Sequence, residues 1–339
     1  MRVVIHGGMF KTGTTSLQQS LNAKRFELSK EGIFYPYSEI GQHSYILNVR
    51  NPLWSGDALR EIAFEAERKG AELILFSGES VSALSQSQFD RLTACFEGWP
   101  VEYVFCFRHW STYLPSRWAQ NCIRRDSQTF EEYLENALNS ALSHFDARFD
   151  LILTRAASSG ASNVHAVSWD LAKSGNESVP VAVLRAASIE ERIIRQITNQ
   201  SQWLNQRLDF LNVEMCRILN GVSTNMLGLV QNELFWVYAD HQECSGFFDY
   251  FKLLHKISPE DRDIFVSTME ATGISEITLP KFDELEGLLF DNHAHRFTNV
   301  IGQQLFGNAG TADLVYKTYP VKWQSCIPIC EKILQYLKI

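Results

Sequence analysis

Short apolar runs separated by longer helical segments place the strongest constraint on the fold of this chain. The runs lie at 2–6, 72–76, 101–107, 163–168 and 180–184. Segments such as 57–69 and 129–143 lie between them and space their apolar residues as helices do. Strands that alternate with helices are typical of parallel βαβ units. We therefore expect an α/β fold with a parallel sheet flanked by helices, and ligands beyond the carboxyl ends of its strands.

The pattern changes beyond about residue 188. The segments 189–220 and 225–256 are long, amphipathic and poor in strand signals, which predicts helices packed on the sheet. The expected organisation is an α/β core over 1–190 followed by a mostly helical carboxyl-terminal part over 191–339. Because 339 residues suffice for one large domain or two smaller ones, the two parts could also form one continuous domain.

Composition excludes several classes of protein. With 31 Lys and Arg against 39 Asp and Glu, the net charge is −8, so we expect no general binding of nucleic acid. The seven cysteines form no CxxC pair, which argues against a disulfide scaffold and a thiolate zinc site. The amino terminus lacks a signal-peptide pattern, and no apolar run approaches the ~18 residues of a membrane span. These features predict a cytoplasmic protein.

The segment His6-Gly7-Gly8-Met9-Phe10-Lys11-Thr12-Gly13-Thr14-Thr15-Ser16-Leu17 is the most informative stretch. It lies between the first predicted strand and a predicted helix with Leu17 and Leu21 on one face. Glycines allow backbone N–H groups to point inward, and a helix amino terminus adds positive potential. Hydroxyl side chains and Lys11 converge on the same place. The segment therefore predicts a cradle for a phosphate or sulfate group.

The spacing of Gly8 and Gly13 matches the Walker A pattern, but Thr14 stands where that pattern requires lysine. The run 72–76 is followed by Ser77-Gly78-Glu79, with no aspartate suited to Mg²⁺. A nucleoside triphosphate site and an ordinary glycine turn are the alternatives to the cradle.

The lysine-first loop resembles the 5′-phosphosulfate loop of sulfotransferases that use 3′-phosphoadenosine 5′-phosphosulfate (PAPS), and the bacterial and carbohydrate-type branches are the most similar. The resemblance implies a P-loop-like phosphosulfate loop in the α/β fold. It also implies that Lys11 neutralises charge on the bridging oxygen of PAPS. The residues it assigns to the 5′-phosphosulfate are Lys11, Thr12, Gly13, Thr14, Thr15 and Ser16.

A second element resembles the 3′-phosphate element of the same family. Arg108 directly follows the run 101–107, and Ser116 comes eight residues later, where we expect the start of the next helix. Arginine offers a planar donor fork to a phosphate, although a surface salt bridge is the alternative interpretation of Arg108. The family's cytosolic small-molecule enzymes also carry a carboxyl-terminal Arg-Lys-Gly segment. Here that tripeptide occurs only at 68–70, where it indicates a cationic helix end with a glycine cap.

Two residues are candidates for the general base. Glu79 follows the run 72–76 in a Ser-x-Glu stretch similar to that of bacterial relatives, and His43 lies in the stretch after the first helix, where bacterial members have a histidine. A surface carboxylate and a loop histidine are the alternative interpretations. We favour Glu79 because a position after a strand is better fixed than one in a loop.

The residues and the resemblance together predict a PAPS-dependent sulfotransferase. It would transfer a sulfuryl group to a hydroxyl or amine of a small-molecule or glycan acceptor, with a saccharide or glycolipid favoured. We expect no metal requirement, because a sulfuryl group carries less charge than a phosphoryl group. His293-Ala294-His295 lacks a third ligand and predicts no metal site. A P-loop small-molecule kinase and a non-catalytic nucleotide-binding module are the alternatives.

Overall fold

The structure is a computed structural model with two compact units. It describes residues 1–9, 11–39, 41–124, 126–139, 147–175, 177–198, 209–226, 254, 257–300, 304–307 and 315–336. The first unit comprises Met1–Trp110, Ser143–Asn205 and Lys281–Thr311, and the second unit comprises Ser111–Leu142, Gln206–Pro280 and Ala312–Ile339. Each unit is thus assembled from three segments of the chain. The division at residue 190 stays a prediction.

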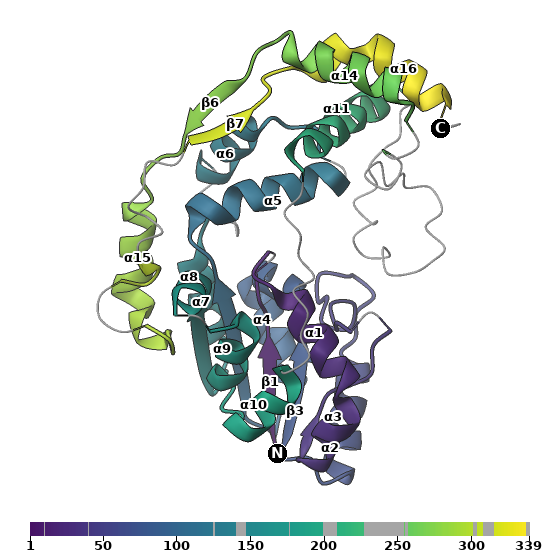
Figure 1. Cartoon of the computed structure of the whole chain (residues 1–339). Coiled ribbons are helices and arrows are strands. Elements are labelled where there is room, and N and C mark those ends of the chain that lie inside the picture. Colours follow the sequence, from purple (N-terminus) through teal and green to yellow (C-terminus); the bar gives the residue numbers. More distant parts are fainter. Residues whose placement is uncertain are drawn as a thin grey trace. The chain divides into compact units, whose positions relative to one another are not determined.

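A five-stranded parallel sheet forms the centre of the first unit (Figure 1). Its strand order is β2-β3-β1-β4-β5. The strands are β1 (Arg2–His6), β2 (Ile33–Phe34), β3 (Leu73–Ser77), β4 (Val101–Phe107) and β5 (Asn163–Ser168). The central strand β1 pairs with β3 on one side, from Arg2↔Leu73 to His6↔Ser77, and with β4 on the other. The predicted α/β fold with a parallel sheet is confirmed.

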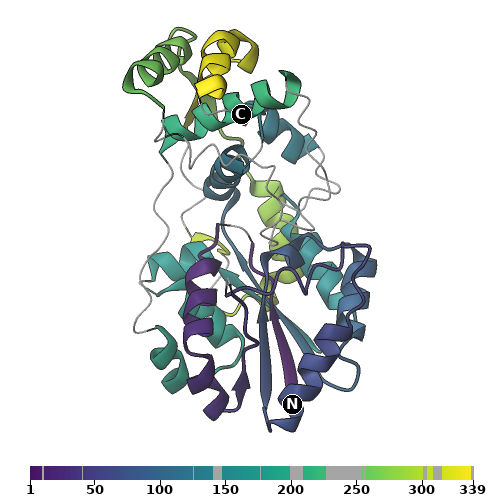
Figure 2. The same cartoon turned by 90° about the vertical axis from the view of Figure 1, so that its right-hand side faces the viewer.

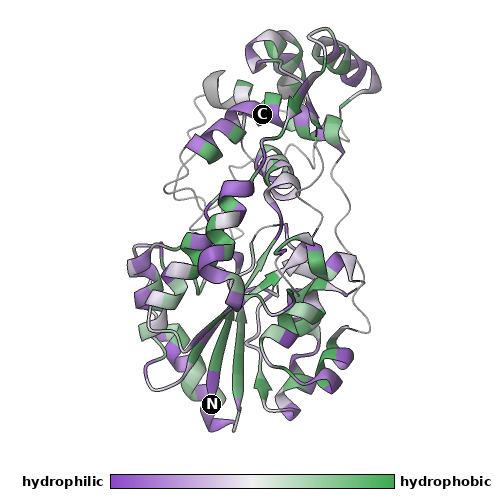
Figure 3. Cartoon of the chain, turned by 90° about the vertical axis from the view of Figure 1, so that its left-hand side faces the viewer, coloured by the Kyte–Doolittle hydropathy of each residue, from purple (hydrophilic) through white to green (hydrophobic). Residues whose placement is uncertain are grey.

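Helices cover both faces of this sheet (Figure 2). On one face, α1 (Thr14–Ala23), α9 (Val179–Ala186) and α10 (Glu191–Thr198) pack in a cluster that includes Val104 and Cys106 of β4. On the other face, the rings of Tyr103, Phe105 and Phe107 stack on one another, since alternate residues of a strand face opposite sides. Their neighbours there are Phe89 of α4 (Gln86–Ala94) and Phe149 of α7 (Phe149–Ser158). Burial on both faces explains the apolar run from Tyr103 to Phe107 in β4, and the strands of the sheet are mostly hydrophobic (Figure 3).

The first unit contains further helices around this framework. They are α2 (Arg25–Lys30), α3 (Asp57–Arg68), η1 (Glu79–Ala83), α8 (Trp169–Ser174), α15 (Asp283–His293) and η3 (Ala294–Arg296). The predicted helix over 57–69 is confirmed as α3. It ends at Arg68, and Gly70 follows with φ 72°, so the tripeptide at 68–70 is a helix end, as expected.

The predicted strand at 180–184 is wrong, because these residues lie within α9. Ser178 caps the helix by accepting a hydrogen bond from the N–H of Val181 (3.4 Å), and Pro180 lies in the first turn, where no N–H partner is needed. Val183 and Leu184 are buried in the cluster under α1 and α10. A short apolar run has the same sequence signal in a buried helix as in a buried strand.

The described residues of the second unit are mostly helical. Its elements are α5 (Trp110–Arg124, whose first residue belongs to the first unit), α6 (Phe130–Asn139), α11 (Phe210–Met226), α14 (Pro259–Glu270), η5 (Trp323–Cys326) and α16 (Ile327–Tyr336), with the antiparallel strands β6 (Ser275–Thr278) and β7 (Val315–Thr318). The sequence did not predict β6 and β7. The predicted helical segment 225–256 lies almost entirely outside the described residues.

A buried ion pair fixes α11 in the second unit. Nε of Arg217 lies 2.6 Å from Oε2 of Glu214, and the two side chains are 1% and 0% exposed. Arg217 also donates to the carbonyl oxygen of Val321 (2.9 Å), and Glu214 accepts from the hydroxyl of Thr318 (2.8 Å). Both charges are therefore satisfied without water, and they connect α11 to the end of β7.

Within the described ranges of residues, no helix combines the length and the apolar character that a membrane crossing requires. The six cysteines that fall in these ranges are buried and free.

Candidate functional site

The loop between β1 and α1, residues 7–13, leaves the carboxyl end of the central strand; we call it the β1–α1 loop. The N–H of Gly7 donates to the carbonyl oxygen of Val104 (3.0 Å), and the N–H of Gly78 donates to that of His6 (2.9 Å). The start of the loop is thereby held between β3 and β4. In this sheet, β2 and β3 lie on one side of β1, and β4 and β5 lie on the other. The loop after β1 therefore lies at a topological switch point, where parallel sheets bind ligands.

The backbone of the β1–α1 loop is tightly folded. Lys11 has φ 63°, a left-handed conformation that costs a residue with a Cβ atom about 1–2 kcal/mol. Gly13 has φ 83° and caps α1. A Cβ atom on Gly8 would lie 2.6 Å from Cγ2 of Thr14 and 2.7 Å from Nε2 of His6. Glycine at position 8 therefore avoids a steric clash, and glycine at position 13 avoids the conformational cost that Lys11 bears. Strain at Lys11 is typical of a functional loop.

The side chains of the loop divide into buried and accessible groups. The hydroxyl of Thr12 is buried and donates to the carbonyl oxygen of Met9 (2.6 Å), so only the backbone N–H of Thr12 remains for a ligand. Thr15 is exposed and Ser16 is half-buried in the first turn of α1. That turn contains no acidic residue. Its unpaired N–H groups therefore provide a positive potential for an anion.

Glu79 lies beside this loop. It begins η1 directly after β3, and its carboxylate accepts a hydrogen bond from the hydroxyl of Thr14 in the first turn of α1. The hydroxyl of Ser82 donates to the carbonyl oxygen of Glu79 (2.8 Å), which fixes the turn. The structure thus brings one of the two candidate bases to the predicted anion cradle.

His43, the other candidate base, is buried with an exposed fraction of 1%. Its Nδ1 accepts from the N–H of Ser77 (3.0 Å), and its Nε2 donates to the carbonyl oxygen of Pro36 (2.9 Å). Its ring packs against those of Tyr35 and Phe76. Burial lowers the pKa of His43 to about 4, so the imidazole is neutral at pH 7. Both ring nitrogens are occupied, and the residue ties the stretch 36–43 to the end of β3.

His6 is a residue of the site that the sequence analysis missed. It ends β1 and is buried beneath Gly8, with Nδ1 2.9 Å from the hydroxyl of Ser77, to which Gln18 also donates (3.1 Å). Its Nε2 is buried and lacks a hydrogen-bond partner among the described residues. Burial lowers the pKa of His6 to about 4. The sequence feature that could have identified His6 is its position as the last residue of the predicted strand, directly before two glycines.

Arg108 and Ser116 fall in different units. Arg108 follows β4 in the first unit, with its guanidinium carbon 4.3 Å from the centre of the Trp169 ring. Burial lowers the pKa of Arg108, and the charge of Asp170 opposes that shift. Ser116 belongs to the second unit. It lies in the second turn of α5, which begins at Trp110, so the expectation that it stands at the helix start is wrong. Their joint binding of one phosphate stays a prediction.

Residues after β5 form a further part of the site that the sequence analysis missed. The N–H of His109 donates to the Asp170 carboxylate (2.7 Å), which joins the segments after β4 and β5. Burial raises the pKa of Asp170. Lys173 also lies over Trp169, with Nζ 5.7 Å from the ring centre. The sequence feature that could have identified Trp169, Asp170 and Lys173 is their position directly after the predicted strand 163–168.

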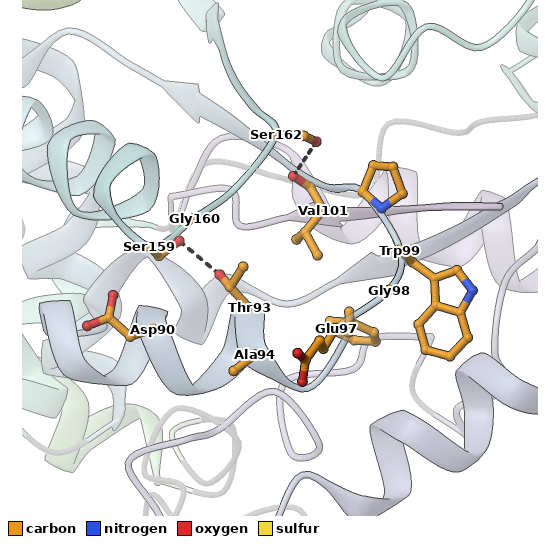
Figure 4. A pocket seen from close by; sticks show the side chains of 12 residues that line it. Asp90, Thr93, Ala94, Glu97, Gly98, Trp99, Val101, Ser159, Gly160 and Ser162 are labelled. Carbon is orange, nitrogen blue, oxygen red and sulfur yellow. Dashed lines mark hydrogen bonds between the residues drawn. The ribbon is translucent and has the colours of Figure 1, made fainter.

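A pocket of about 440 Å³ lies at the opposite edge of the sheet, near the amino ends of β4 and β5 (Figure 4). Asp90 and Glu97 place carboxylates in its wall, which disfavours an anionic ligand. Hydrogen bonds of Thr93 to Ser159 (2.8 Å) and of Ser162 to the carbonyl oxygen of Val101 (2.8 Å) already pair polar groups there. The pocket is therefore not the predicted anion site.

In the described part of the chain, no three His, Cys, Asp or Glu side chains are grouped so that they could hold a metal ion. His293 instead pairs its Nε2 with the hydroxyl of Thr154 (3.0 Å).

Comparisons of the chain with protein-family models, curated proteins and solved structures found no significant match. A functional proposal therefore depends on the residues of the site.

Proposed function

We propose that this protein is a PAPS-dependent sulfotransferase that acts on a hydroxyl or amine of a small-molecule or glycan acceptor, with a saccharide or glycolipid favoured. The observation that carries the proposal is the hydrogen bond between Thr14 and Glu79. It places a carboxylate at the start of α1, beside the glycine loop that carries Lys11. A proton acceptor and an anion-binding loop are the two parts that sulfuryl transfer requires.

The proposed reaction is an in-line displacement at sulfur. The acceptor oxygen or nitrogen forms a bond to sulfur while the bond from sulfur to the bridging oxygen breaks, and adenosine 3′,5′-bisphosphate leaves. Lys11 neutralises the charge that develops on the bridging oxygen, and the backbone N–H groups of residues 12–16 hold the 5′-phosphosulfate. Glu79 accepts the acceptor's proton. The protein thus acts by positioning and by charge stabilisation.

Glu79 is a better base than His43 in this proposal. Both ring nitrogens of His43 form hydrogen bonds within the protein, and its side chain is buried, so no ring nitrogen is available to an acceptor. Glu79 lies beside the loop, with its carboxylate at the first turn of α1.

Arg108 has the proposed role of binding the 3′-phosphate of PAPS, with Ser116 as a second donor. Arg108 follows β4, the neighbour of β1, so it lies at the same edge of the sheet as the β1–α1 loop. A partly buried guanidinium binds a phosphate oxygen more strongly than an exposed one does.

A P-loop small-molecule kinase is the second candidate, because a hydroxyl paired with a carboxylate also suits phosphate-bound Mg²⁺. Against it, Thr14 occupies the position of the lysine that such kinases need. A non-catalytic nucleotide-binding module would use the same loop without turnover. Mg²⁺-dependent ATP hydrolysis would favour the kinase, and tight nucleotide binding without turnover of any acceptor would favour the module.

Calorimetric titration of the purified chain tests the nucleotide part of the proposal. We expect adenosine 3′,5′-bisphosphate to bind more tightly than adenosine 5′-phosphate, and Arg108→Ala to remove most of that difference. Losing a charge-assisted contact costs roughly 1.5–3 kcal/mol, which corresponds to about 10- to 100-fold in affinity. Equal affinity of the unmodified protein for the two nucleotides would contradict the assignment.

A further inference from the structure

Two cations lie over one tryptophan at the carboxyl ends of β4 and β5. The guanidinium carbon of Arg108 is 4.3 Å from the centre of the Trp169 ring, and Nζ of Lys173 is 5.7 Å from it. All three residues belong to the first unit and are partly buried. Trp169 packs against the hydrophobic cluster beneath α1, α9 and α10, so the ring is anchored from the core.

The positive charges lie close enough to influence each other. Burial lowers the pKa of Lys173, and the charge of Arg108 lowers it further. The nearby carboxylate of Asp170 favours the charged form of Arg108, and it also accepts the N–H of His109 at 2.7 Å. Holding two like charges together costs free energy in the unliganded protein. A bound anion with more than one negative charge would relieve that repulsion.

The ring also restricts the orientation of both side chains. A guanidinium stacked on an indole keeps its N–H donors in its own plane, pointing away from the ring. Lys173 follows Trp169 by four residues in α8, so the two side chains share one face of the helix. The fork of Arg108 and the point charge of Lys173 thus both lie against the same indole ring.

We propose that Lys173 is the second cation of the phosphate site headed by Arg108, and that Trp169 is the positioning residue that holds both. The inference rests on the proposed function and extends it to the chemical class of the group bound. A terminal phosphate monoester carries a charge of about −1.5 to −2 at pH 7, which matches two cations. A sulfate ester carries one negative charge and would match only one of the two cations. Arg108 and Lys173 together therefore select a nucleotide with a 3′-phosphate over a nucleotide without it.

Calorimetry with adenosine 3′,5′-bisphosphate and adenosine 5′-phosphate tests the role of Lys173. We expect Lys173→Met, which keeps the apolar stem on the ring, to weaken bisphosphate binding about tenfold and to leave monophosphate binding within about twofold. Lys173→Arg should restore most of the affinity. Lys30→Met, at an exposed position in α2, is the matched control and should bind both nucleotides like the unmodified protein.

Trp169 is tested in the same titrations. Trp169→Phe keeps an aromatic face and should retain most of the preference for the bisphosphate, whereas Trp169→Leu should lose it. Thermal unfolding of each variant shows whether it is folded. If Trp169→Leu is folded and keeps the full preference, the positioning role is overturned.

The outcomes separate this inference from the proposed function. If the unmodified protein prefers the bisphosphate, Arg108→Ala loses that preference and Lys173→Met keeps it, the inference about Lys173 is wrong and the proposed function stands. If Lys173→Met weakens both nucleotides equally, Lys173 does not act on the 3′-phosphate, and the inference is again wrong. If the unmodified protein shows no preference, both are overturned.

Discussion

The hydroxyl of Thr14 donates a hydrogen bond to the carboxylate of Glu79, 65 residues away in the sequence. The sheet brings them together: β1 and β3 are neighbours, with His6 opposite Ser77, so the loops that leave both strands start at the same level. Thr14 begins the helix after one strand, and Glu79 begins the turn after the other. The contact is therefore a consequence of strand order, which no local sequence pattern records.

Replacing Lys11 should affect turnover more than binding. We expect Lys11→Ala to lower sulfuryl transfer by about 10²–10³-fold, as for the loss of a preorganised charge stabiliser, while affinity for adenosine 3′,5′-bisphosphate falls far less. Steady-state rates and calorimetry on the same samples measure the two effects. Lys30→Ala is the control, because its position in α2 is exposed. Near-normal turnover of Lys11→Ala would remove Lys11 from the mechanism.

Replacing Glu79 should leave binding intact and stop the reaction. Glu79→Gln keeps an oxygen that can accept from Thr14 but removes the proton acceptor, so we expect nucleotide affinity within about threefold and a loss of turnover of about 10²–10⁴-fold. Thr14→Val removes the hydroxyl and should reduce turnover less. If Glu79→Gln stays active, and His43→Ala is inactive with nucleotide affinity intact, the roles of Glu79 and His43 must be exchanged.

The buried histidines should make the protein sensitive to acid. The pKa of His43 and that of His6 are lowered from 6.5 to about 4, so the folded state holds both neutral while the unfolded state takes up protons below pH 6.5. The contribution of the two neutral histidines to the free energy of unfolding is fully present above pH 6.5 and is lost as the pH falls toward 4. At pH 5 the loss is about 2 kcal/mol for each histidine.

Urea unfolding at pH 7 and pH 5 measures this loss. His43→Gln should reduce the difference between the two pH values by about 2 kcal/mol, whatever its stability at pH 7. His295→Gln, at an exposed position, should leave the difference unchanged. An unchanged difference in His43→Gln would contradict a neutral, buried His43.

The second unit offers a stability test that is independent of the site. Arg217→Met leaves Glu214 buried without its cation, and we expect a loss of about 3–5 kcal/mol in the free energy of unfolding. Combining it with Glu214→Gln removes the unpaired charge and should recover part of that loss. Urea unfolding of the two variants measures both effects. A single variant within about 1 kcal/mol of the unmodified protein would show that the pair contributes little.

Sequence periodicity predicted the elements that bury apolar residues on both sides. The strands β1, β4 and β5 match their predicted bounds, and β3 is displaced by one residue. The run 180–184 was misassigned because a helix covered by the core has the same apolar composition as a strand. The two-residue strand β2 and the pair β6–β7 are too short, or too exposed, to give a periodic signal.

The sequence predicted only the part of the candidate site that consecutive residues form. The β1–α1 loop was visible as a sequence segment, but the burial of His43 depends on Tyr35 and Phe76, which are brought to it by tertiary packing. Trp169 and Lys173 come next to Arg108 only because β5 lies next to β4 in the sheet. Strand order therefore determines the parts of the site that the sequence analysis missed.

The most direct test of the central claim is an acceptor screen with ³⁵S-labelled PAPS. The purified protein is incubated with panels of saccharides, glycolipids, phenols and amines, without added metal and with ATP plus Mg²⁺ in parallel. We predict transfer of label to at least one acceptor, stoichiometric release of adenosine 3′,5′-bisphosphate, and loss of both in Lys11→Ala. Phosphoryl transfer from ATP with no transfer of label from PAPS would contradict the account.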